Sequence, residues 1–106
     1  MPAAPKLPAS IKVGHLDFSI VLVPGADIGA YGDCHHDEQR IRIDAALKPQ
    51  TMAETVVHEV LHACWPGHMK GDGGREELIV TALSPNICQV MRDNPKLFEW
   101  LSDALK

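Results

Sequence analysis

The sequence predicts an α+β domain in which a small antiparallel sheet precedes three helices. Residues 16–23 carry large apolar side chains at every second position, which is the period of a half-buried strand. Residues 75–92 repeat apolar side chains every three or four positions, which is the period of a helix. With 106 residues the chain has room for one core. We therefore expect a single domain over residues 10–106, after a flexible N-terminal tail rich in Pro and Ala over residues 1–9.

The strands are expected to form two hairpins. Residues 11–13 stand before Gly14 and His15, so they are a candidate partner for residues 16–23. Residues 30–34 and 40–43 flank a polar run and are expected to pair with each other, with Ile41 and Ile43 facing inward.

Three helices should follow the sheet. Thr51 and Glu54 are spaced as a capping box, Pro66 and Gly67 supply a stop, and the residues between have an apolar face. After a glycine-rich loop, the second helix is expected to continue through a kink at Pro85. A short third helix beginning after Asn94 would seal the core with apolar residues: Leu97, Phe98, Leu101 and Leu105.

The most informative segment is His58-Glu59-Val60-Leu61-His62 on the first of these helices. A spacing of four places both imidazoles on one helix face, close enough to share one tetrahedral Zn²⁺, with the Glu59 carboxylate beside the metal as a general base. The competing interpretation is a pair of histidines that only pack or face water. The flanking helix signals favour a zinc site.

A catalytic zinc site needs a third protein ligand and leaves one position for water. The expected apolar stripe of the second helix contains Ile79, Val80, Leu83, Ile87 and Val90. Glu76 is the first candidate, because its helical phase places it with Val80, Leu83 and Ile87 on the side where the two helices should pack. Glu77 lies about 100° further around that helix. His68 follows the second histidine by six residues, as in metzincins, but Trp65 stands where that pattern requires Gly.

Composition excludes several classes of protein. A net charge of −4 and the lack of a basic stripe argue against nucleic-acid binding. No run of residues has the length and apolar character of a membrane span or a secretion signal. Three cysteines without a C-x-x-C pair indicate neither disulfides nor a zinc ribbon, so a cytoplasmic protein is expected. Cys34 and His36 form a weaker candidate metal pair, and Cys64 is expected to be a small buried apolar residue.

Several short segments resemble small zincin-type proteins of phages and prophages, similar in plan to the ImmA/IrrE metallopeptidases, which are minimal gluzincins. The segments are residues 31–34, 39–44, 55–63, 75–77 and 93–95. The resemblance implies a zincin-like fold, a zinc ligand on the helix after the His-Glu helix, at the position of Glu76, and a substrate bound along an edge strand. For a phage-encoded protein it also implies the host cell cytoplasm.

Together these features predict a zinc-dependent metallopeptidase that hydrolyses peptide bonds of an intracellular protein. Zn²⁺ would be held by His58, His62 and Glu76, and the base would be Glu59. A donor for the developing oxyanion is also needed, and four side chains are candidates: Tyr31, His35, His36 and His68. The alternatives are a non-catalytic, zinc-stabilised module that binds a host or repressor protein, and a hydrolase of non-peptide amides or esters.

Overall fold

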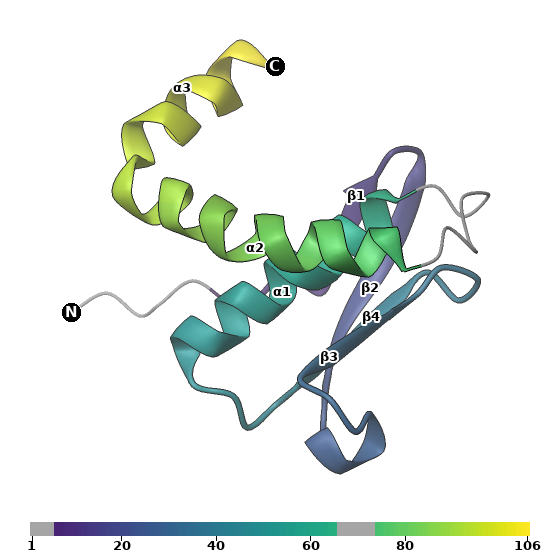
Figure 1. Ribbon diagram of the computed structural model, residues 1–106. Helices are drawn as coiled ribbons and strands as arrows, with labels where there is room; N and C mark the ends of the chain where they lie inside the picture. Colours follow the sequence, from purple (N-terminus) through teal and green to yellow (C-terminus); the bar gives the residue numbers. More distant parts are fainter. Residues whose placement is uncertain (1–5, 66–73) are drawn as a thin grey trace.

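Four strands and three helices follow one another along the chain (Figure 1). The computed structural model describes residues 6–65 and 74–106. The strands are β1 (Ser10–Val13), β2 (Leu16–Val23), β3 (Gly32–His35) and β4 (Arg40–Asp44), with a short 3₁₀ turn, η1 (Gly25–Asp27), after β2. The helices are α1 (Pro49–Cys64), α2 (Arg75–Asp93) and α3 (Pro95–Ala104).

The sheet is mixed, in the order β1-β2-β4-β3, so the expectation of an antiparallel sheet was wrong. Both predicted hairpins are present, because β1 pairs antiparallel with β2 and β3 pairs antiparallel with β4. The two hairpins are joined by a parallel pairing of β2 with β4, with Ile20 opposite Ile41. The chain between these two parallel strands contains η1 and β3. In this strand order β3 lies at an edge of the sheet.

The core lies between one face of the sheet and α1. Most of the predicted inward residues are buried, since Phe18 and Ile20 of β2 meet Ile41 and Ile43 of β4, but Leu22 near the end of β2 is 50% exposed. Ala63 of α1 completes this cluster, and further residues of the same helix pack against its rim: Met52, Val56 and Val60. This packing fixes the rotation of α1 about its axis and therefore determines which face of the helix points away from the core.

Helix α1 begins three residues earlier than the capping-box pattern indicated, since its N-cap is Lys48 and not Thr51. Pro49 occupies the first turn, Lys48 is the N-cap, and no side chain caps the helix. Thr51 therefore lies inside the helix. The expected capping box was wrong because Pro49, whose φ is already helical and which has no amide to satisfy, begins the helix without it.

Gly32 allows α1 to approach β3 closely. A Cβ atom at this position would lie 2.9 Å from the carbonyl oxygen of Arg42 and 2.9 Å from Cγ2 of Thr55. Real Cβ atoms are not found that close to other heavy atoms, so either the strand or the helix would have to move. Because Gly32 has no side chain, the face of α1 that carries His58 can lie close to the edge strand β3.

Replacing Gly32 by Ala is expected to destabilise the protein by about 1–3 kcal/mol, the usual cost of overpacking. The measurement is urea denaturation of the two proteins. Thr55→Ser removes the Cγ2 atom, so the double variant should lose less stability than the sum of the two single changes. Strict additivity would show that the contact with Thr55 does not cause the loss.

Helix α2 continues through Pro85 as predicted, but a different face of it is buried. Val80 and Ser84 are its buried residues, whereas Ile79 and Leu83 of the expected apolar stripe are exposed. The Ser84 hydroxyl donates to the Val80 carbonyl at 2.6 Å, which satisfies it inside the helix contact. A small residue lets α1 and α2 approach more closely than a leucine would.

Helix α3 follows Pro95, as expected, but it does not seal the core. None of its residues is buried, and Trp100 is 65% exposed. Figure 1 shows α3 beyond the end of α2, away from the sheet. In the part of the chain that the structure describes, no helix is long and apolar enough to cross a membrane.

The last residues of the predicted N-terminal tail contact the folded body. Leu7 packs against the core, and the Ala9 carbonyl accepts a hydrogen bond of 2.8 Å from the amide of Ile20. Contacts with the domain therefore begin before β1.

Candidate metal centre

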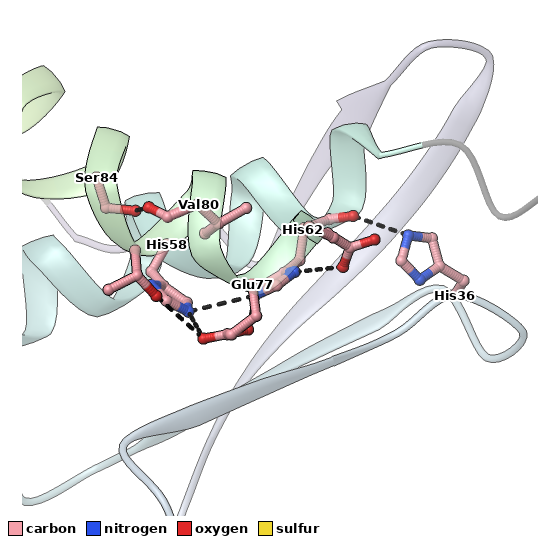
Figure 2. Close-up of polar contacts among 8 residues, drawn as sticks. His36, His58, His62, Glu77, Val80 and Ser84 are labelled. Atoms are coloured by element: carbon pink, nitrogen blue, oxygen red, sulfur yellow. Dashed lines mark hydrogen bonds and ion pairs between the residues drawn. The ribbon is translucent and has the colours of Figure 1, made fainter. Parts of the chain in front are cut away.

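The two histidines of α1 point toward each other on the helix face next to β3 and α2 (Figure 2). Their ring centroids are 4.9 Å apart, and their Nε2 atoms are 3.3 Å apart. Two nitrogen ligands about 2.0–2.1 Å from one tetrahedral Zn²⁺ lie about 3.3–3.4 Å from each other. The spacing of the two nitrogen atoms therefore fits two ligands of one zinc ion.

A third candidate ligand atom comes from Glu77 at the start of α2. Its Oε1 lies 3.3 Å from Nε2 of His58, and its Oε2 lies 2.8 Å from Nε2 of His62. The shorter contact is the length of a charge-assisted hydrogen bond, and it reaches the spacing of two zinc ligands with a shift of about half an ångström. Among the described residues, His58, His62 and Glu77 are the only group of three or more suited to hold a metal ion.

Glu76, the expected third ligand, meets the other edge of the same imidazole. Its Oε2 lies 2.5 Å from Nδ1 of His62, not beside Nε2. A Nδ1–H that donates to Glu76 leaves the lone pair of Nε2 for a metal, which is the usual arrangement behind a metal-binding histidine. The geometry favours Glu77 as the third candidate ligand and Glu76 as the support of the His62 ring.

Glu59 lies in the most buried row of α1, between Thr55 and Ala63. It is 6% exposed, lines the groove beside the histidines, and makes no hydrogen bond with another described residue. Desolvation raises the pKa of its carboxyl to about 7; the nearby carboxylates of Glu77 and Asp33 add to this rise, and His62 opposes it. A carboxyl with a pKa near neutrality is suited to accept and return a proton.

Zinc-free protein offers a direct test of this buried carboxyl. Because the pKa of Glu59 is higher in the folded protein than in the unfolded chain, protonation of this carboxyl stabilises the fold. This contribution is fully present below pH about 4.5 and is lost as the pH rises through about 7. In a chelator, we expect the Tm of the wild type to fall over this range relative to the Tm of Glu59→Gln. Thermal melts of both proteins measure this difference, and a constant difference across the range would contradict it.

The other candidate side chains lie around this centre. His36 donates through Nε2 to the main-chain carbonyl of His62 at 2.8 Å, and its ring packs edge-on against Phe18. Cys34 packs against the core, and burial raises the pKa of its thiol to about 12. Neither residue belongs to the group of three that is suited to hold a metal ion among the described residues. Cys64 is exposed, contrary to expectation, and His68 lies outside the described residues.

A groove of about 890 Å³ runs past the centre, between the edge strand and the two helices. The loop before β3 and β3 itself form one wall, with exposed Tyr31 and with His35. Helix α1 contributes Thr51, Glu54 and the histidines, and α2 contributes residues as far as Pro85. The three candidate ligand atoms are therefore accessible from an open channel.

Comparison of the chain with protein-family models, with curated proteins and with solved structures found no match. The interpretation of this centre therefore depends on its own geometry.

Sequence reasoning did not anticipate two features of the site. It ranked Glu76 above Glu77 from the phase of large apolar residues, whereas the buried residues of α2 are Val80 and Ser84 and the structure brings Glu77 to Nε2 of His62. The available signal in the sequence for this buried face was Ser84, a small polar residue one turn after the apolar Val80. The contact of His36 with the His62 carbonyl links residues 26 positions apart, and no local pattern indicates it.

Proposed function

We propose that this protein is a zinc-dependent metallopeptidase of the minimal gluzincin type. The observation that carries the proposal is the convergence of ligand atoms from His58, His62 and Glu77 within 4.8 Å of one another, on the wall of an open groove. The buried Glu59 carboxyl beside them supports a catalytic site, because a structural zinc site has no need of a base.

Each residue of the centre has a separate task in this mechanism. His58, His62 and Glu77 would hold Zn²⁺, which supplies Lewis acidity toward water and toward a peptide carbonyl. Glu76 holds the ring of His62 in orientation through Nδ1. Glu59 would take a proton from the attacking water and deliver it to the departing amine.

The edge strand β3 gives the groove a way to hold a peptide. It pairs with β4 on one side only, so main-chain groups on its other side are available to an added strand. Tyr31 and His35 lie on the same wall and are candidate donors to the developing oxyanion. His36 is less suited to that task, because its Nε2 already donates to a carbonyl.

The test begins with the purified protein and its metal content. We expect one zinc ion per chain by elemental analysis and cleavage of fluorescein-labelled casein, with cleavage lost in a chelator and restored by Zn²⁺. Protein without stoichiometric metal, whose cleavage is indifferent to chelators, would overturn the proposal.

A non-catalytic zinc-stabilised binding module is the second candidate, and one observation favours it. Helix α3 exposes Leu97 and Trp100, its C-cap Leu105 is exposed as well, and apolar surface gathered on one element often binds another protein. Elemental analysis for zinc and the casein cleavage assay separate the two candidates. Bound zinc with no hydrolysis of any peptide or protein tested would favour the module.

A further inference from the structure

Acidic side chains dominate the groove that contains the candidate metal centre. Its walls hold seven carboxylates and four imidazoles, and no described lysine or arginine lines it. The carboxylates belong to Asp33, Asp37, Glu38, Glu54, Glu59, Glu76 and Glu77. A groove with charges of one sign concentrates the electrostatic potential and attracts ligands of the opposite sign.

Most of these carboxylates already have a partner. Asp33 accepts from Nε of Arg42 at 2.9 Å, Glu38 pairs with Arg40, and the two glutamates of α2 meet the imidazoles. Three of them make no hydrogen bond or ion pair with another described residue: Asp37, which is exposed, Glu59, which is buried, and Glu54, which is half-buried. The charge of Glu54 contributes to the raised pKa of Arg92, but the Arg92 guanidinium pairs with its own neighbour Asp93 at 3.2 Å. The Glu54 carboxylate is thus left for a ligand of the groove.

The position of Glu54 relates it to the bond that would be cleaved. It precedes His58 by four residues and His62 by eight, so all three lie on one face of α1. Four helical residues rise about 6 Å, which places Glu54 about 9 Å along the helix from a point midway between the histidines. An extended peptide advances about 3.3 Å per residue, so this distance corresponds to about three residues of substrate.

We propose that the groove selects peptides carrying Lys or Arg about three residues from the scissile bond, with the cationic group paired to Glu54. This inference rests on the proposed peptidase function and adds the substrate class to it. The half-buried position of Glu54 strengthens such a pair relative to one at the open surface.

The experiment uses zinc-loaded protein and two internally quenched peptide libraries that differ only in having Lys and Arg, or Asp and Glu, at their charged positions. We expect kcat/KM to be at least about tenfold higher for the basic library. Glu54→Gln should reduce this ratio severalfold, and Glu54→Lys should reverse it. Glu99→Gln, which removes the same charge from the exposed surface of α3, is the matched control and should keep the wild-type ratio.

A binding measurement separates failure of this inference from failure of the peptidase proposal. The probe is a fluorescein-labelled peptide of alternating Lys and Ala, with a Glu and Ala peptide beside it, titrated with zinc-loaded Glu59→Gln protein. Equal cleavage of both libraries, unchanged by Glu54→Gln, would overturn the inference and leave the peptidase standing. No cleavage by the wild type, together with binding of the Lys peptide that depends on Glu54, would overturn the peptidase and support the cationic selectivity of the groove.

Discussion

Replacing Glu59 by Gln is expected to lower kcat for peptide hydrolysis by about 10²–10⁴-fold while the protein keeps its zinc. The amide has nearly the shape of the carboxyl group but cannot take a proton from water. Zinc is retained because Glu59 is not among the three converging ligand residues. The measurements are single-peptide kinetics and elemental analysis on the same preparation.

Two comparisons make this result specific. Glu99→Gln removes a carboxylate from the surface of α3 and should leave both kcat and zinc content unchanged. Zinc content close to that of the wild type in Glu59→Gln shows that the loss of rate is chemical. A Glu59→Gln protein that still cleaves at the wild-type rate would remove Glu59 from the mechanism.

Replacing Glu77 by Ala should weaken zinc binding far more than replacing Glu76 by Ala. Loss of a carboxylate behind a metal-binding histidine typically costs about 10–100-fold in affinity, and loss of a direct ligand should cost more than that. Glu77 lies beside Nε2 of His62, the atom proposed to bind zinc, whereas Glu76 lies beside Nδ1 on the opposite side of the same ring. Competition titrations with a chromophoric chelator measure both constants.

Cobalt substitution distinguishes the two roles independently of affinity. The visible spectrum of Co²⁺ reports its own ligand set, so Glu77→Ala should change the spectrum and Glu76→Gln should largely preserve it. Glu76→Gln can still accept the hydrogen bond from Nδ1 through its amide oxygen, which makes it the conservative control. A larger spectral change with Glu76→Gln than with Glu77→Ala would reverse the two assignments.

The local elements were predictable because short-range patterns determine them. Alternation identified the inward residues of β2 and β4, and Asn94 with Pro95 marked the start of α3. The α+β class was correct for the same reason. The parallel pairing of β2 with β4 was not predictable, because the pattern of a half-buried strand is the same whichever way its neighbour runs.

The candidate site was predictable where it lies on one helix and less so where two elements meet. The four-residue spacing of His58 and His62 fixes their common face once α1 forms. The choice between Glu76 and Glu77 depends on how α2 rotates against α1, and Val80 and Ser84 determine that rotation. Neighbouring positions on a helix differ by about 100°, so a small error in the assumed phase exchanges the two carboxylates.

The position of α3 gives the molecule a modular construction. No residue of α3 is buried, and the groove is lined by β3, α1 and α2 together with the loops beside β3. The sequence of α3 is therefore free to diverge without disturbing the chemistry of the centre. Substitutions on the exposed surface of this helix would leave the residues of the candidate metal centre in place.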